Sequence, residues 1–434
     1  MSHRLHGSAT CGLLAAVGTG LFLAWILPSG VSVVQGQTKD QTPGTAAPAG
    51  PSMDPAVAKD WMRRWKLNII RDSHKERYCD KEMGETIGWV VSPFLDGFYY
   101  GYMVTGDREW VDRLIDWGDS VIKRGVKEPD GYIGWPKEEN GDVLDYLPDG
   151  ETERYTDVEV GDAMFFRPLV MMAGEILKTP TLKIEYGGKA EEYIRLSEEM
   201  FEKWESRGAW RDTKEGGAWV VPPFGLDPKT GKWTGAYEKR MTDGNSLPDN
   251  KENQITKWVI AMYDVTHKPI YRDRAEKWCR VMRSRMKLRD NGKYFVWNYW
   301  DPAVPWDTNP DGSLKHWEGV HPSGGYYADD VEAIVDAYEH GLVFTREDIA
   351  RLIATNRDFM WNHQIKNAQF KRIDGGQPAQ RWAETPGVLW DALAPYDPTL
   401  RKIFEANLIP DDWSGMVSTP AWILRFGPKS EYAP

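Results

Sequence analysis

The chain is long, acidic and rich in aromatic residues. Its 434 residues include 22 Trp, 19 Tyr and 13 Phe, 27% of the residues are charged, and the net charge is −11 at pH 7. Nucleic acid is not an expected partner because phosphate binding needs a basic surface. Some of the aromatic side chains are expected to pack helix against helix, and others to face sugar rings, whose C–H faces suit flat apolar surfaces.

The N-terminal segment is expected to be a targeting sequence rather than part of the folded domain. Arg4 precedes an apolar run at 12–27, and the small residues at 34–36 suit cleavage before Gln37. We therefore expect a signal peptide at 1–36, a secreted or periplasmic protein, and no stable membrane insertion after cleavage. An uncleaved anchor is the alternative, because the run approaches the ~20 residues that span a bilayer. Residues 37–54, rich in Pro, Ala, Gly and Thr, are expected to form a disordered linker.

Helical periodicity runs through most of residues 55–434, which are expected to form a single domain. Asp107, and Thr345 with Asp348 three residues on, have the pattern of helix N-caps. Long loops at 129–156, 210–248 and 294–325 are expected on one face. The predicted helices are, in chain order, 55–82, 87–104, 108–124, 157–177, 189–206, 253–265, 271–288, 328–340, 346–361, 382–394, 398–407 and 416–426.

A helix-pair pattern occurs twice, 161 residues apart. Both copies, at 102–113 and 263–274, read Tyr-x-Val-Thr-x-x-x-x-aromatic-x-Asp-Arg, and each is followed by a Trp four residues later. An aromatic segment then follows each copy, at 130–135 and at 291–297. A recurring hairpin of this kind indicates an array in which each unit buries its face against the next.

These hairpins and aromatic loops resemble the (α/α) toroid superfamily of carbohydrate-active enzymes. That superfamily includes uronate polysaccharide lyases, glucuronyl epimerases, unsaturated-glucuronyl hydrolases and several inverting glycosidases. The resemblance covers most of residues 55–425 and implies an all-α toroid of about five to six helical hairpins. Asn253-Gln254 and the segment 321–330 look like site-facing segments of the lyase and epimerase branch.

The segment that begins at His321 is the leading chemical candidate. A histidine, a glycine-rich bend and two tyrosines lead into a predicted helix, so these groups can converge on one point. Elimination from a uronate, or epimerisation at C5, needs a base for the proton beside a carboxylate and a group that neutralises the charge. The catalytic candidates are His321, Tyr326 and Tyr327, with a purely structural role in the loop as the alternative. The substrate-binding candidates are Asn253, Gln254, Arg167, Trp135, Trp297, Tyr299 and Trp300.

Carboxylates at predicted helix starts offer a second chemistry. Inverting hydrolysis uses an acid and a base roughly 6.5–9.5 Å apart. The candidates are Glu159, Asp162, Asp329 and Asp330. Acidic residues also favour helix starts for electrostatic reasons alone, so a structural role stays open for each.

Three classes of function therefore remain open. The first is a secreted lyase or epimerase that acts on a uronic-acid-containing polysaccharide. The second is a glycoside hydrolase, inverting or of the unsaturated-glucuronyl type, and the third is a non-catalytic glycan-binding protein. No cofactor and no metal are expected, because the sequence has no phosphate loop, His-Glu-x-x-His or paired Cys-x-x-Cys motif. Whether Cys79 and Cys279 pair is left open.

Overall fold

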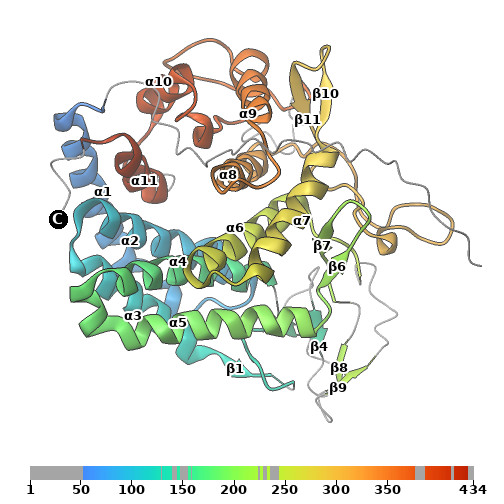
Figure 1. The fold of residues 1–434 in the computed structure, drawn as a ribbon. Helices are drawn as coiled ribbons and strands as arrows, with labels where there is room; N and C mark the ends of the chain where they lie inside the picture. The colour runs from blue at the N-terminus through green and yellow to red at the C-terminus, as the bar shows by residue number, and fades with distance from the viewer. Residues whose placement is uncertain are drawn as a thin grey trace, which may run out of the picture. The chain divides into compact units, whose positions relative to one another are not determined.

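The computed structural model is drawn in Figure 1. It describes residues 52–128, 130–138, 144–146, 155–157, 159–222, 225–227, 232–234, 244–376, 387–411 and 415–428. The expected signal peptide at 1–36 lies outside these residues, as does almost all of the expected linker at 37–54. Within the described ranges no helix is long and apolar enough to cross a membrane.

The described residues are mainly helical, and their strands are short. The α-helices are α1 (Pro55–Glu76), α2 (Ser92–Thr105), α3 (Arg108–Arg124), α4 (Glu159–Lys178), α5 (Pro180–Ser206), α6 (Asp249–Thr266), α7 (Pro269–Arg285), α8 (Gly325–Glu339), α9 (Arg346–Ile353), α10 (Pro398–Asn407) and α11 (Gly415–Phe426). Shorter helical turns are η1 (Tyr78–Asp80), η2 (Ile87–Val91), η3 (Pro305–Asp307), η4 (Ala354–Met360) and η6 (Asp391–Leu393).

All strands lie in the connections and pair antiparallel within small local sheets. They are β1 (Val126–Lys127) with β2 (Ile133–Gly134), β3 (Lys137–Glu138) and β4 (Leu144–Tyr146) with β5 (Tyr155–Asp157), β6 (Trp210–Asp212) with β7 (Gly217–Trp219), β8 (Gly225–Asp227) with β9 (Lys232–Thr234), and β10 (Lys287–Arg289) with β11 (Tyr294–Val296).

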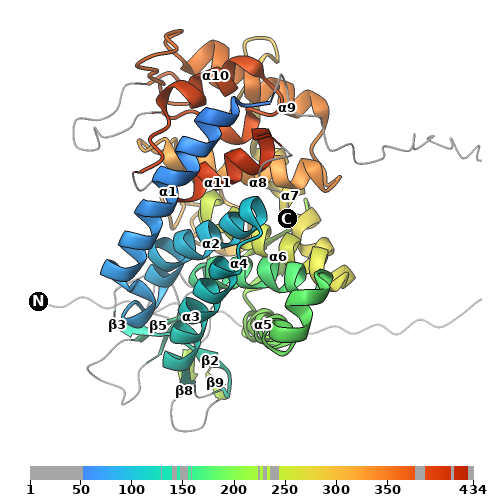
Figure 2. The same ribbon diagram turned by 90° about the vertical axis from the view of Figure 1, so that its left-hand side faces the viewer.

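The helices form an inner and an outer set (Figures 1 and 2). Helix α2 packs against α4, α4 against α6, and α6 against α8, while the C-terminal α11 returns to pack against α2. We call α2, α4, α6, α8 and α11 the inner helices. Their outer partners are α3, α5, α7, α9 and α1, and the short turn η6, which contacts α8 and α10, stands where a further inner helix would lie. This arrangement of six helical pairs is the all-α toroid that the sequence predicted.

The first and last helices close the toroid. Trp65 on α1 donates its indole N–H to the carbonyl of Met416 on α11 at 2.7 Å, and this bond is buried. The backbone N–H of Met53 bonds the carbonyl of Phe426 at 2.7 Å. The sixth pair is therefore assembled from the two ends of the domain.

The two repeat copies adopt the same hairpin at the level of single hydrogen bonds. Thr105 and Thr266 each donate their hydroxyl to the carbonyl four residues earlier, at 2.7 Å in both cases. The next residue ends the helix in the left-handed region, with φ of 63° at Gly106 and 57° at His267. The Thr of the repeat is thus part of a helix stop, which explains its fixed spacing from the next helix.

Several predicted boundaries differ from the structure; for example, the helix predicted at 55–82 ends at Glu76 and is followed by the short turn η1. Helix α5 begins at Pro180 rather than near residue 189, because proline at the first helical position is pre-organised for a helix. The helix predicted at 346–361 is α9 followed by the π-helical turn η4. Of the helix predicted at 382–394, residues 382–386 lie outside the described ranges and only 391–393 form a turn.

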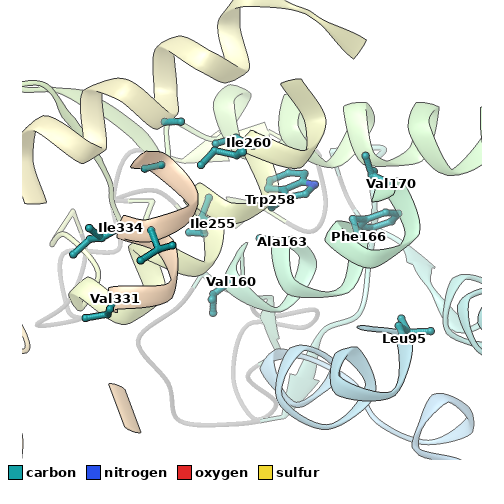
Figure 3. Packing of buried hydrophobic residues seen from close by; sticks show 14 of the residues in the cluster. Leu95, Val160, Ala163, Phe166, Val170, Ile255, Trp258, Ile260, Val331 and Ile334 are labelled. Atoms are coloured by element: carbon teal, nitrogen blue, oxygen red, sulfur yellow. The ribbon is translucent and has the colours of Figure 1, made fainter. Parts of the chain in front are cut away.

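Much of the aromatic content is core. Figure 3 shows apolar side chains of the inner helices, among them Phe166, Trp258 and Ile334, in close packing. Cys79 and Cys279 are buried free thiols and do not pair. Ten tryptophans are almost completely buried: Trp65, Trp110, Trp117, Trp135, Trp204, Trp219, Trp258, Trp278, Trp297 and Trp390.

Candidate active site

Charged side chains from four successive inner helices meet inside the toroid. Arg167 on α4 lies 3.1 Å from the carboxylate of Asp96 on α2. Lys257 on α6 lies 2.8 Å from the carboxylate of Glu332 on α8. Arg167 also lies within the electrostatic field of Glu332, which joins the two ion pairs. These contacts identify the face of each inner helix that points inward.

Glu332 combines an enclosed position with an accessible carboxylate. Its side chain is 48% accessible, whereas the side chains of Asp96 and Arg167 are 16% and 13% accessible. Desolvation would raise the pKa of Glu332, but Lys257 and Arg167 outweigh it and hold that pKa below the usual value. Glu332 is therefore ionised near neutral pH. Burial raises the pKa of Asp96, against the opposing effect of Arg167 and Lys257.

Two further carboxylates belong to this group, and both have raised pKa values. Burial raises the pKa of Asp329, in the first turn of α8, to about 7, with Glu332 and Asp391 adding to the shift and Lys257 opposing it. Burial, followed by the charge of Glu332, raises the pKa of Asp391 to about 6. Asp391 lies on η6 and was not among the predicted candidates. We call this set the axial cluster; its members are Asp96, Arg167, Lys257, Asp329, Glu332 and Asp391.

His321 lies among aromatic rings at the start of α8. Its ring centroid is 4.7 Å from that of Tyr299 and 4.6 Å from that of Tyr326. Nδ1 accepts a hydrogen bond from the backbone N–H of Ser323 at 3.0 Å, and burial lowers the pKa of the imidazole. A neutral ring in this setting carries its proton on Nε2, so Nε2–H can donate a hydrogen bond while Nδ1 is not free to act as a base.

Tyr327 is hydrogen-bonded to the loop that carries His321. It is 2% exposed, and its hydroxyl accepts the backbone N–H of His321 at 2.9 Å. Burial raises its pKa far above the usual value. This geometry suits the positioning of His321 and does not suit the acid-base role that was expected for Tyr327.

Among the four aromatic residues predicted to bind substrate, two are buried, so the expectation that they present their rings to a sugar is wrong for these two. Trp135 and Trp297 are each 1% exposed, because their indole N–H groups bond to the buried Val121 carbonyl and Asp330 carboxylate. Tyr299 and Trp300 keep partial exposure. Trp300 stacks on His316 with a centroid distance of 4.1 Å and an interplanar angle of 5°.

Asn253 is part of the packing between α6 and α8. Its amide donates to Asp330 at 2.7 Å and accepts the indole N–H of Trp278 at 2.7 Å. Gln254 is 7% exposed and precedes Lys257 by three residues on α6, which places it on the same side of the helix. Asp330 accepts hydrogen bonds from two neighbours, Asn253 and Trp297, and burial raises its pKa well above the usual value.

The other two carboxylate candidates are also enclosed. Asp162 accepts the indole N–H of Trp204 at 2.9 Å and pairs with Lys203 at 3.2 Å. Glu159 is 4% exposed, and burial raises its pKa well above the usual value. Among the four predicted carboxylates, Asp329 alone belongs to the axial cluster. Within the described ranges no group of three or more His, Cys, Asp or Glu residues is placed to hold a metal ion.

Comparisons with known proteins find similarity of fold only. No family model matches the sequence, and no curated protein matches it significantly. The solved structure of the GH76A α-1,6-mannanase of Salegentibacter sp. HEL1_6 is 11% identical with a TM-score of 0.43, covering 86% of this chain and 97% of that one. The cellobiose 2-epimerase of Bacillus thermoamylovorans B4167 is 10% identical with a TM-score of 0.46, covering 85% and 87%. An unsaturated glucuronyl hydrolase specific for heparin is 9% identical with a TM-score of 0.36, covering 83% and 100%. At this level the shared feature is the helical arrangement alone.

Proposed function

We propose that this chain is a carbohydrate-active enzyme that hydrolyses a glycosidic bond, with Asp329 as the proton donor. The observation that supports this most is that two enclosed carboxyl groups from different elements, Asp329 on α8 and Asp391 on η6, lie close enough for the charge of Asp391 to act on Asp329. Asp329, with a pKa of about 7, keeps a proton near neutral pH, whereas Asp391, with a pKa of about 6, is mainly ionised there. Two carboxyl groups whose environments separate their pKa values are suited to act as acid and base.

The chemistry follows from these two protonation states. Asp329 donates its proton to the glycosidic oxygen as the bond from that oxygen to the anomeric carbon breaks. Asp391 accepts a proton from the water whose oxygen forms the new bond to that carbon. Burial is the main cause of the raised pKa of Asp329, and the negative charge of Glu332, which pairs with Lys257 at 2.8 Å, adds to it.

The charge of the axial cluster favours a neutral sugar over a uronate. Its four carboxyl groups, Asp96, Asp329, Glu332 and Asp391, outnumber its two cations. Both cations, Arg167 and Lys257, already have carboxylate partners. A uronate carboxylate entering this site would therefore have to compete with Asp96 or Glu332 for a cation, which disfavours its binding.

Elimination or epimerisation is the second candidate, and the position of His321 between Tyr299 and Tyr326 supports it. It ranks second because Nδ1 is occupied by the N–H of Ser323. A base would have to be the ionised form of a neighbouring tyrosine or carboxylate.

A panel assay distinguishes the candidates. The purified chain is incubated with neutral, amino-sugar and uronate polysaccharides while reducing ends and ultraviolet absorbance are followed together. New reducing ends from a neutral or amino-sugar glycan, without added absorbance, are expected. A rise in absorbance on a polyuronate would instead show elimination, and binding without turnover would indicate a non-catalytic glycan-binding protein.

A further inference from the structure

Trp317 is a half-exposed aromatic residue on the loop between β11 and α8. Its side chain is held in place, since the six-membered part of the indole lies against Gly319. A Cβ added to Gly319 would stand 2.9 Å from Cζ2 of Trp317, and φ of Gly319 is +150°. The residue as a whole is nevertheless 50% exposed. Trp317 therefore offers a fixed apolar surface to solvent.

A continuous series of aromatic rings leads from Trp317 to the axial cluster. The ring centroids of Trp317 and Tyr299 are 6.1 Å apart, and those of Tyr299 and Tyr326 are 5.1 Å apart. Tyr326 precedes Asp329 by three residues on α8, so the two side chains lie one above the other on the same side of the helix. A chain molecule resting on Trp317 would thus be directed toward Asp329.

We propose that Trp317 is the stacking platform of a glycan subsite that lies outside the catalytic centre and binds a neutral or amino-sugar pyranose. The proposal rests on the proposed function. The C–H face of a pyranose covers the exposed indole, and its hydroxyl edge reaches polar groups at the rim. Glu318, which is exposed and lies 3.4 Å from the amide nitrogen of Asn298, supplies such a group. Its carboxylate also disfavours a uronate at this position.

The chain contains a matched control for this residue. Trp306 lies on the same loop and is 44% exposed, but the guanidinium of Arg211 covers its ring at 5.4 Å from the centroid. Trp306→Ala therefore removes an exposed indole from the same loop. Unlike the Trp317 ring, the Trp306 ring is covered by Arg211.

The test is affinity electrophoresis of the full chain in native gels that contain a neutral β-glucan, an α-mannan, chitosan or a polyuronate. All proteins carry Asp329→Asn, so that retardation reports binding without turnover. With the glycan that retards the parent most, Trp317→Ala should weaken binding about tenfold, as expected for the loss of one buried aromatic face. Trp306→Ala should leave binding unchanged, and thermal melting checks that each variant is folded.

The platform proposal is overturned if Trp317→Ala binds as the parent does, if both variants lose the same affinity, or if no gel retards the parent. It is also overturned if the polyuronate retards the parent most. The proposed function can fail separately from the platform. In that case Trp317→Ala loses binding selectively, but the chain that carries Asp329 shows no turnover. The protein would then have a glycan-binding platform without being a hydrolase.

Discussion

The Nζ atom of Lys257 on α6 lies 2.8 Å from Oε2 of Glu332 on α8, and this ion pair sets the charge around Asp329. Lys257 lowers the pKa of Asp329, whereas Glu332 raises it. Burial, the largest effect, raises the pKa of Asp329 to about 7, so Asp329 keeps a proton at a pH where most carboxyl groups are ionised. A contact between two inner helices thus modulates a pKa that burial has raised.

The first prediction concerns the pH dependence of activity. Activity requires ionised Asp391 and protonated Asp329, whose pKa values are about 6 and about 7. The pH profile of kcat/KM should therefore be bell-shaped, rising near pH 6 and falling near pH 7. Initial rates between pH 4 and pH 9 at constant ionic strength measure this profile. A plateau that persists above pH 8 would be inconsistent with Asp329 as the acid.

Removing the positive charge of Lys257 should shift the fall in kcat/KM at high pH to a still higher pH. Lys257→Met deletes the group that opposes the raised pKa of Asp329, so the fall should shift to higher pH. Lys251→Met is the control, because Lys251 lies on the same helix but pairs with Glu85 at 3.0 Å. The profiles of both variants are compared with that of the unchanged chain. Equal shifts in the two variants would show that the fall does not report this ion pair.

Folding stability should also depend on the axial carboxyl groups. The folded-state pKa of Asp329 is raised from 3.8 to about 7, so the native state binds more protons than the unfolded state between about pH 4 and pH 7. The free energy of unfolding should consequently fall as pH rises through this window. Asp329→Asn removes this titration, and its free energy of unfolding, measured in urea, should fall less steeply with pH. An identical slope would mean that Asp329 does not titrate there.

The two repeat copies allow a paired test of backbone strain. His267 occupies the left-handed position that Gly106 occupies in the other copy, with φ of 57° and 63°. His267→Gly should therefore raise the free energy of unfolding by up to about 1 kcal/mol, and Gly106→Ala should lower it by a similar amount. Urea unfolding measures both. A loss of stability in His267→Gly would show that the contacts of the imidazole outweigh the backbone strain.

The repeat was readable from the sequence because its chemistry is local. Thr105 and Thr266 bond within their own helices, and Gly106 and His267 end them, so the pattern survives without knowledge of the tertiary structure. The fold followed from this hairpin, since such units must pack against one another. The signal peptide and its cleavage site remain predictions.

The residues of the axial cluster were harder to predict from the sequence, because membership depends on which side of each helix points inward. Asp329 was a candidate from its place at a helix start, but Glu332, Lys257 and Asp391 were not. The available signal was the spacing of three residues between Asp329 and Glu332, which places both on the same side of α8.

The error over Trp135 and Trp297 has a related cause. Their loops were correctly recognised as equivalent, yet each indole N–H found a buried acceptor, and the sequence does not reveal where such an acceptor lies. The two loops are equivalent, as predicted, but the prediction that Trp135 and Trp297 are exposed was wrong.

Substitution of Asp329 tests the central claim most directly. Asparagine resembles the protonated carboxyl group in size and hydrogen bonding, so Asp329→Asn should fold while losing the proton that catalysis needs. Asp336→Asn, two turns further along α8 and paired with His340 at 3.3 Å, is the control. The measurement is kcat/KM for release of reducing ends from the neutral or amino-sugar glycan that the chain cleaves. The account predicts a loss of about 10²–10⁴-fold in Asp329→Asn and little change in Asp336→Asn. Full activity in a folded Asp329→Asn variant would contradict it.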